Sequence, residues 1–274
     1  MSANFLELAG VHVLVTGASG GVGVETARAF LEQGAKVTLH YNTTRTTLEP
    51  LLSEYPETTC AVKAAISDEG EVALAFEQAA QALGPVQVLV VNHGIWPTDD
   101  ILVKDMSLEH WSRTIDVNLT GSFLAIRQHM RQLVAHGVQD NVAVVMVGST
   151  AGKFGEAYHA DYAASKSAMM HGLTLSLKNE IVKFCPRGRV NTVAPGWIRT
   201  PMAAVALQQS DVVSRAFATS PLNKVSEPHD VARTILFLAS ESAAGNITGH
   251  VIDVNAGMEG RLLNPVSAAE TPQP

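Results

Sequence analysis

Seven short runs of strand-forming residues, separated by longer segments with helical apolar spacing, organise most of this chain. The runs are VHVLVT (11–16), KVTLHY (36–41), TCAVKAA (59–65), VQVLVVN (86–92), NVAVVMVG (141–148), GRVNTVA (188–194) and HVIDVN (250–255). A helical apolar face between two runs is formed by Val72, Leu74, Ala75, Phe76, Ala79 and Leu83. Parallel strands can be joined only through a crossover, so this alternation predicts a parallel sheet with helices on both faces.

The length of the chain fits one domain of this class. With 274 residues, 46% of them hydrophobic, the chain can bury one substantial core. We predict an α/β fold: a single doubly wound domain over residues 1–261, with a seven-stranded parallel sheet flanked by helices. Residues 262–274 are rich in Pro, Ala and polar residues, and we predict a loose tail there.

Charge and composition narrow the classes of partner. The formal net charge is -7, which argues against nucleic acid and acidic membrane surfaces, because both require clustered Lys and Arg. No apolar stretch approaches the roughly 20 residues that span a bilayer, and the first residues lack a signal-peptide pattern. Cys60 and Cys185 have no partner at disulfide or zinc spacing, so we expect buried thiols and no metal site. We therefore predict a cytoplasmic protein that acts on a small molecule.

A glycine-rich turn follows the first predicted strand. The sequence TGASGGVG (16–23) stands between that strand and a helical pattern. Gly17 permits a tight turn, Gly21 lets the backbone approach a pyrophosphate, and Gly23 lets the helix pack close to the strand. The motif by itself is weak and also fits a plain structural turn, but its position between strand and helix favours dinucleotide binding.

A second group of residues carries acid–base chemistry. Ser149 ends the fifth predicted strand, and Tyr162 and Lys166 follow on the next helix, four positions apart and so on one face. A neighbouring ammonium favours phenolate, so we expect Lys166 to lower the pKa of Tyr162 from about 10 towards the range useful for proton transfer. The alternative is an amphipathic helix with a snorkelling lysine. The order of glycine turn, Ser149 and the Tyr–Lys pair in one α/β chain favours an active site at the carboxyl ends of the strands.

These features resemble the short-chain dehydrogenase/reductase family, in its classical single-domain branch, over roughly residues 8–257. The matching pieces are TGASGGVG (16–23), Asn92 and Gly94, Asn118 in DVNLTG, Ser149, YAASK (162–166), APGWIRT (194–200) and ITGHVIDVNAG (247–257). The resemblance implies a Rossmann-type fold and a nicotinamide cofactor that supplies the hydride chemistry. It implies that Tyr162 gives a proton to a carbonyl oxygen that Ser149 holds. Lys166 would bind the nicotinamide ribose, and Asn118 would hold a water in a proton relay.

The cofactor is expected to lie against five segments of the chain. The expected cofactor-binding residues are Gly17, Ser19, Gly21, Val22, Gly23, Tyr41, Asn42, Thr43, Arg45, Asn92, Gly94, Tyr162, Lys166, Pro195, Gly196, Ile198 and Thr200. His93 stands between Asn92 and Gly94 where the family usually has a small residue. We expect either a hydrogen-bonded structural histidine or a role near cofactor or substrate.

The end of the second predicted strand bears on the choice of cofactor. A carboxylate there would bind the adenosine 2′-OH and repel a 2′-phosphate. The sequence instead reads HYNTTR (40–45), with hydroxyl and amide groups and with Arg45. These groups fit a doubly charged phosphate, so we predict NADP(H) in preference to NAD(H). Arg45 also fits a solvated loop charge.

Aromatic residues near the predicted site suggest a substrate pocket. Trp96 and Trp197 follow the fourth and sixth predicted strands and could line an apolar pocket or serve in ordinary packing. Tyr158 lies four residues before Tyr162 but has no lysine four positions on, so we assign it to the pocket or to packing. The family resemblance also implies a homotetramer or homodimer that uses the predicted long helices around 107–136 and 160–184.

The leading hypothesis is therefore an NADP(H)-dependent carbonyl reductase that acts on a ketone or secondary alcohol, with Tyr162 as general acid or base. The alternative within the enzyme class is an NAD-dependent alcohol or polyol dehydrogenase. A hypothesis of another class is a non-catalytic dinucleotide-binding regulator, which has no chemical need for Ser149, Tyr162, Lys166 and Asn118 together.

Overall fold

The computed structural model describes residues 5–260. Seven strands in these residues form one sheet in which every neighbouring pair is parallel. The strands are β1 (His12–Val15), β2 (Lys36–Tyr41), β3 (Thr59–Lys63), β4 (Val88–Val91), β5 (Ala143–Val147), β6 (Arg189–Pro195) and β7 (Val251–Val254). Their order, β3-β2-β1-β4-β5-β6-β7, is that of a Rossmann-type doubly wound sheet. The predicted fold class is confirmed, and the predicted tail lies outside the described residues.

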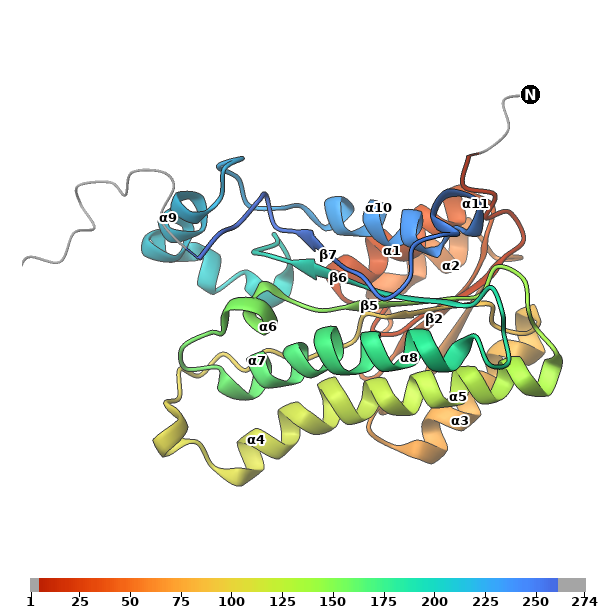
Figure 1. Cartoon of the computed structure of the whole chain (residues 1–274), viewed down its shortest axis with the longest axis horizontal. Helices are drawn as coiled ribbons and strands as arrows, with labels where there is room; N and C mark the ends of the chain where they lie inside the picture. The colour runs from red at the N-terminus through yellow and green to blue at the C-terminus, as the bar shows by residue number, and fades with distance from the viewer. Residues whose placement is uncertain (1–4, 261–274) are drawn as a thin grey trace, which may run out of the picture.

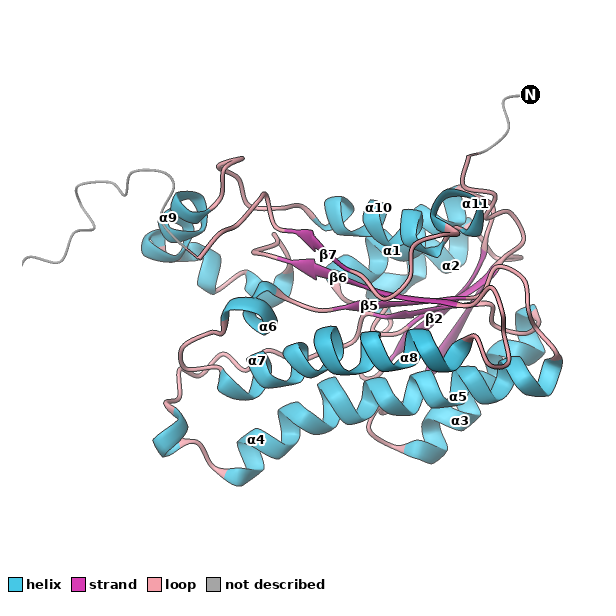
Figure 2. Ribbon diagram, in the orientation of Figure 1, coloured by secondary structure: helices cyan, strands magenta, loops and turns pink. Residues whose placement is uncertain are grey.

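Helices cover the sheet on both faces (Figures 1 and 2). One layer contains α1 (Gly21–Glu32), α2 (Glu49–Glu54), α10 (Pro228–Ala239) and α11 (Glu241–Ala244). The other layer contains α3 (Glu69–Leu83), α4 (Leu108–Ile115), α5 (Gly121–His136), α7 (Ala160–Ser167) and α8 (Thr174–Ile181). Beyond the carboxyl ends of β5 and β6 lie α6 (Thr150–Phe154) and α9 (Ser210–Thr219) (Figure 1).

Two of the helical segments contain a π-helical turn. The segment η3 (Asp116–Thr120) joins α4 to α5, and η4 (Ala168–Leu173) joins α7 to α8. The predicted long helices around 107–136 and 160–184 are therefore present, each with an inserted wide turn. Such turns are rare and occur mostly at functional sites. Four short 3-10 turns complete the elements: η1 (Thr46–Leu48), η2 (Val103–Asp105), η5 (Pro201–Ala203) and η6 (Ala206–Gln208).

Alternation along the strands divides the core between the two faces of the sheet. In β1, Val13 and Val15 pack with Phe30 of α1, whereas Leu14 packs with Phe76 of α3. Side chains of a strand point alternately to opposite faces, and both faces here are covered by helices. On α3 the predicted apolar face is wrong at Leu74, which is exposed because it lies outside the stripe that contacts the sheet.

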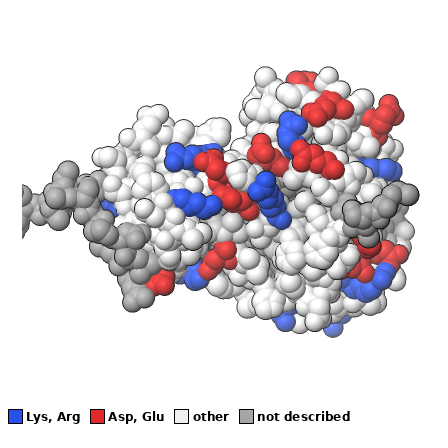
Figure 3. Space-filling view, turned by 90° about the horizontal axis from the view of Figure 1, so that it is seen from above, with Lys and Arg blue, Asp and Glu red and all other residues white. Residues whose placement is uncertain are grey.

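On the face shown in Figure 3, Lys and Arg side chains lie beside Asp and Glu side chains. The described residues on this face form no large patch of a single charge. Among residues 5–260, no helix is long and apolar enough to cross a bilayer. Cys185 is buried as expected, and Cys60 is only partly buried. No group of three metal-ligating side chains occurs within the same described range.

Candidate active site

The glycine-rich turn is held at the carboxyl end of β1 by two neighbouring strands. Gly17 has φ +61, a conformation that favours glycine, and its N–H donates to His40 Nδ1 at 3.0 Å. Asn92 Nδ2 donates to the carbonyl oxygens of Thr16 at 3.1 Å and Gly17 at 3.0 Å. His40 of β2 and Asn92 after β4 thus hold the turn by hydrogen bonds from the two strands beside β1. Asn92, predicted to bind cofactor, therefore positions the turn, and His40 is a turn-positioning residue that the sequence analysis missed.

The amino end of α1 has no side-chain cap. Its N-cap is Gly20, so no side chain accepts from the first N–H groups of the helix, the groups that were predicted to face the phosphates. Gly21 lies against Thr200, because a Cβ built on Gly21 would be 3.0 Å from Thr200 Cγ2. The side chain of Thr47 donates to Ser19 O at 2.9 Å. Two of the predicted cofactor segments, around Gly21 and Thr200, are thus brought together, and Thr47, which was not predicted, joins the loop after β2 to the glycine turn.

A Gly23→Ala variant is expected to be less stable and to bind dinucleotide more weakly. The added Cβ would lie 2.3 Å from Gly17 O and 2.8 Å from Ala18 Cα. Overpacking of this kind costs about 1–3 kcal/mol of stability. A loss of the same size in the free energy of binding would lower the affinity for NADPH by about fivefold to about 150-fold. Thermal melting and fluorescence titration measure both effects. The matched control is Gly20→Ala, whose Cβ would meet nothing closer than 3.4 Å; equal losses in the two variants would contradict the packing argument.

The serine, tyrosine and lysine predicted to act together converge beside the end of β5. Ser149 caps α6, where its Oγ accepts from Ala151 N–H at 3.1 Å, and its side chain is hydrogen-bonded to Tyr162. Lys166 lies behind them in α7, buried, with Nζ donating to Val147 O at 2.8 Å. The Nζ atom is 5.8 Å from the centre of the Tyr162 ring. The arrangement places two hydroxyl groups side by side with a buried ammonium nearby.

The predicted direction of the tyrosine pKa is wrong for the protein alone. Burial raises the pKa of Tyr162 to about 12, the hydrogen bond from Ser149 lowers it, and the charge of Glu156 raises it further. Burial also lowers the pKa of Lys166 to about 8. Removal from water penalises both charged forms, and this effect exceeds the attraction between ammonium and phenolate at their separation. Tyr162 therefore holds its proton firmly at neutral pH.

Asn118 is buried in the π-turn η3, and its side chain links three elements. Its Nδ2 donates to Ile95 O at 3.0 Å and to Ser165 Oγ at 3.1 Å, while its Oδ1 accepts from Ile95 N–H at 2.8 Å. The Asn118 carbonyl oxygen accepts from Ser122 Oγ at 2.5 Å. Asn118 thus ties the loop after β4 to the helix that carries Tyr162. Its expected role in a proton relay stays a prediction.

His93 fills the space between the glycine turn and η3. Its Nδ1 is 2.8 Å from Thr16 Oγ1, and a Cβ built on Gly17 would lie 2.8 Å from its Cα. Burial lowers the pKa of His93 to about 3, with smaller contributions from the charges of His40 and Lys166. The side chain is therefore neutral and hydrogen-bonded. These contacts fit the structural interpretation of the two that the sequence left open.

The arginine of the loop after β2 pairs with a residue close to it in the sequence. Arg45 is exposed and pairs with Glu49, with Nε 2.7 Å from Oε1. Tyr41 is partly buried, whereas Asn42 and Thr43 are exposed. Val22, also predicted to bind cofactor, has its side chain in the core, which leaves only its backbone for a ligand.

The segment after β6 is fixed by the chain around Ser226. Ile198 forms a parallel bridge with Ser226, Arg199 N–H donates to Ser226 O at 3.0 Å, and Ser226 N–H donates to Trp197 O at 3.0 Å. Gly196, next to Pro195 at the end of β6, lies against Asn255. The predicted nicotinamide segment is thus hydrogen-bonded to the chain that leads into α10.

Trp96 and Trp197 pack against each other. Their rings are 6.3 Å apart and edge to face, and Trp96 also packs against His159, with ring centres 4.6 Å apart. Tyr158, the third predicted substrate residue, is 46% exposed and has φ 71. Glu156 joins this group through a hydrogen bond from Trp96. Sequence analysis missed Glu156, and the available signal was an acidic residue between Ser149 and Tyr162.

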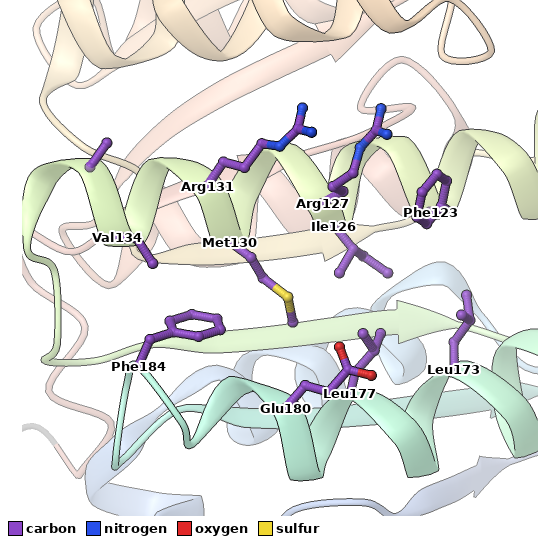
Figure 4. Close-up of a pocket in the computed structure, with 11 residues that line it drawn as sticks. Phe123, Ile126, Arg127, Met130, Arg131, Val134, Leu173, Leu177, Glu180 and Phe184 are labelled. Carbon is purple, nitrogen blue, oxygen red and sulfur yellow. The ribbon is translucent and has the colours of Figure 1, made fainter.

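An apolar groove lies away from this site, in the helical layer that contains α5 and α8. It runs between α5 and α8, with Phe123, Ile126 and Met130 on one side and Leu173 and Leu177 on the other (Figure 4). Arg131 and Glu180 stand at its edge. The groove contains none of the predicted catalytic residues.

Comparison with known proteins places the chain among relatives of similar length. A protein family described as Enoyl-(Acyl carrier protein) reductase matches residues 17–259. The 3-oxoacyl-[acyl-carrier-protein] reductase of Synechocystis sp. is 34% identical over 249 residues, which cover 89% of this chain and 95% of that protein. The cis-4-hydroxycyclohexanecarboxylate dehydrogenase of Sinomonas cyclohexanicum is 32% identical over 246 residues, covering 89% and 94%.

A solved structure has the same fold. The protein titled Short-chain dehydrogenase/reductase SDR:Glucose/ribitol dehydrogenase from Brucella melitensis superposes with a TM-score of 0.83 at 29% identity. The superposition covers 93% of this chain and 99% of that one.

Proposed function

Because the chain belongs to the short-chain dehydrogenase/reductase family of NAD(P)-dependent oxidoreductases, we propose that it is an NADPH-dependent carbonyl reductase with a single catalytic domain. The proposed reaction converts a ketone to a secondary alcohol. The observation that carries the proposal is the hydrogen-bonded Ser149–Tyr162 pair with Lys166 buried behind it, at the carboxyl end of the sheet. The relatives named as 3-oxoacyl-[acyl-carrier-protein] reductases make 3-oxoacyl thioesters the first substrate class to test.

The residues of the site would have separate roles in this reaction. Gly21 and the amino end of α1 would hold the pyrophosphate, and the Pro195–Thr200 segment would hold the nicotinamide, which supplies the hydride when bound. The hydroxyl groups of Ser149 and Tyr162 would both bind the carbonyl oxygen and so orient the carbonyl carbon. Tyr162, protonated at neutral pH, would transfer its proton to that oxygen as negative charge develops. Lys166 would lower the cost of the phenolate that remains.

A paired binding and turnover experiment tests this function. The purified protein is titrated with NADPH and NADH, and oxidation of the preferred cofactor is followed with ketones, aldehydes and 3-oxoacyl thioesters. We expect tight NADPH binding and turnover with a 3-oxoacyl thioester. Failure to bind either cofactor would contradict the whole assignment, and binding without turnover on every compound would favour the non-catalytic regulator.

A second candidate within the same chemistry has weaker support, from one relative. The Sinomonas protein is named as a dehydrogenase of a secondary alcohol, cis-4-hydroxycyclohexanecarboxylate, and it is nearly as similar as the reductases. An NAD-dependent alcohol or polyol dehydrogenase is therefore the alternative. Preferred binding of NADH, with faster oxidation of alcohols than reduction of ketones, would favour it.

The preference for NADPH can be tested at Arg45. We expect Arg45→Ala to weaken NADPH binding about tenfold and to change NADH binding less than about twofold, because only NADPH presents a phosphate to the guanidinium. Arg45 pairs with Glu49, so binding requires the guanidinium to exchange this partner for the phosphate. Glu49→Gln is the control, and it should strengthen NADPH binding. Equal effects of Arg45→Ala on both cofactors would show that Arg45 does not select the phosphate.

We also propose that a second copy of the chain covers the groove between α5 and α8 in a homodimer or homotetramer. Phe123 and Val134, which line this groove, are exposed. An apolar groove with exposed side chains commonly marks an interface. A Phe123→Glu variant is expected to shift the mass measured by light scattering towards the monomer, whereas Leu74→Glu on α3 should not. A wild-type protein that is monomeric at micromolar concentration would contradict this part of the proposal.

A further inference from the structure

A row of polar contacts joins the segment α4–η3–α5 to the segment α7–η4, which lie side by side in Figure 1. In each contact the two partners are 47 positions apart, and along each segment the contact residues recur every fourth position. The contacts are Thr114 Oγ1 to Asp161 Oδ2 at 2.5 Å, Asn118 Nδ2 to Ser165 Oγ at 3.1 Å and Ser122 Oγ to Met169 Sδ at 3.8 Å. Residues four positions apart share one face of a helix, so one face of each segment lies against the other. We call these three contacts the polar seam.

The first contact of the polar seam holds a carboxyl group away from water. The side chain of Asp161 is 0% exposed, and Thr114 is buried as well. Asp161 Oδ2 also lies 3.4 Å from Nε2 of His110, four positions before Thr114 on α4. Burial of a carboxyl group costs free energy unless hydrogen bonds replace its water. An acidic residue that only complemented the helix dipole could remain exposed. The contact therefore fixes the start of α7 to one place on α4.

The N-cap of α7 does not fix the start of this helix. His159 is the N-cap, and its side chain forms no capping hydrogen bond within the described part of the chain. One turn into the helix, Ser165 Oγ accepts from Asn118 Nδ2 and donates to Tyr162 O at 2.7 Å. Asp161 and Ser165 thus attach one face of α7 to α4 and η3 at two successive turns.

The neighbouring face of α7 carries the groups that are proposed to react. Tyr162 and Lys166 each follow a residue of the polar seam by one position, which is a turn of about 100° around the helix axis. Tyr162 is hydrogen-bonded to Ser149, and Lys166 Nζ donates to Val147 O at 2.8 Å. The phenol oxygen is far from the helix axis, so a small rotation of α7 moves it further than the backbone. A misplacement of about 1 Å can lower a rate about 10²-fold.

We propose that Asp161 is a positioning residue: its hydrogen bond with Thr114 sets the rotation of α7 and so holds the Tyr162 hydroxyl group in place beside Ser149. The inference rests on the proposed reductase function. Hydrogen bonds are directional, whereas apolar packing is not. Apolar packing between α4 and α7 would therefore define this rotation less narrowly. Asp161 acts through Tyr162 and needs no contact with a substrate.

The test replaces both partners of the bond, in Thr114→Val/Asp161→Leu. Apolar replacement of both leaves neither partner buried and unpaired, so we expect a stability near that of wild type. The chain has four tyrosines, and carbon-13 NMR of tyrosine-labelled protein identifies the Tyr162 signal by its absence from Tyr162→Phe. We expect this signal to move or broaden in the double variant. We expect kcat with NADPH and a 3-oxoacyl thioester to fall at least about tenfold, and NADPH affinity to stay within about threefold. An unmoved signal, or a kcat equal to that of an active wild type, would overturn the inference.

A conservative variant tests whether the bond itself is responsible. Asp161→Asn keeps an oxygen acceptor for Thr114 in a side chain of the same shape. We expect the Tyr162 signal at its wild-type position and a kcat within about threefold of wild type. A displaced signal in Asp161→Asn would overturn the inference by itself, whether or not the double variant folds.

A matched control separates positioning from a general loss of stability. Thr38 is also buried, and its Oγ1 lies 2.8 Å from His12 Nε2, on β2, with β1 and β4 between it and β5. Thr38→Val should lower the melting temperature and leave the Tyr162 signal unmoved and kcat within about twofold. Equal displacement of the signal in Thr38→Val and the double variant would overturn the inference. Lack of wild-type turnover with every ketone, with the signal displaced only in the double variant, would overturn the proposed function instead.

Discussion

A Tyr162→Phe variant is expected to lose about 10³-fold in kcat while binding NADPH with an affinity within about threefold of wild type. The change removes one hydroxyl group, the one that is bonded to Ser149 and would protonate the carbonyl oxygen. The ring remains to fill its place beside Lys166. Single-turnover oxidation of NADPH measures the chemical step, and fluorescence titration measures the cofactor affinity.

Tyr158→Phe provides the matched control for this prediction. Tyr158 is the same residue type four positions earlier, and its side chain is largely exposed. We expect its kcat to stay within about threefold of wild type. Undiminished turnover in Tyr162→Phe, or an equal loss in both variants, would show that Tyr162 is not the proton donor.

The second large effect is a steep loss of stability in mild acid. Burial lowers the pKa of four histidines well below the ordinary 6.5, to about 4 for His12 and His40 and about 3 for His93 and His129. Below pH 6.5 the unfolded chain binds protons that the folded chain excludes, so stability is fully present above that pH and is lost as the pH falls towards 4. Each histidine changes the free energy of unfolding by up to about 1.4 kcal/mol per pH unit, so the four together change it by up to about 5 kcal/mol per pH unit. Domains have about 5–15 kcal/mol of stability in all, so we expect unfolding near pH 5 in chemical-denaturation series.

His129→Leu isolates one member of this group. His129 is fully buried near Phe76, and neither of its ring nitrogens has a hydrogen-bond partner within the described part of the chain. An apolar side chain of similar size is therefore expected to stabilise the protein at about pH 5 and to reduce the slope of stability against pH by about a quarter. A slope equal to that of wild type would mean that His129 is protonated in the folded state or does not titrate in this range.

The fold was largely predictable because its strands carry a local signal. Each of the seven predicted runs contains a strand, since β-branched residues buried on both faces leave a continuous apolar pattern. The ends of the strands differ by a few residues, as where β3 ends at Lys63 instead of residue 65 and β6 continues through Pro195. The π-turn at Asn118 was not predictable, because it depends on tertiary contacts with Ile95 and Ser165.

The residues of the site could be predicted where their chemistry depends on spacing along the sequence. They could not be predicted where their chemistry depends on burial of the side chain. Ser149, Tyr162 and Lys166 were found from their order along the chain, and the structure brings them together. The direction of the shift in the tyrosine pKa could not be predicted, because the sequence shows the neighbouring lysine but not the loss of water around the tyrosine. Glu156 was missed for the same reason, since the burial that raises its pKa is not visible in the sequence.

The contact between Gly21 and Thr200 also bears on how the protein is made. The proposed phosphate end of the site begins at the first helix, yet one wall of it is Thr200, 179 positions further along the 274-residue chain. During translation the glycine turn leaves the ribosome early, but it meets Thr200 and Pro201 only after β6 has been synthesised. A nascent chain therefore completes its cofactor site late, when non-local contacts of high sequence separation have formed.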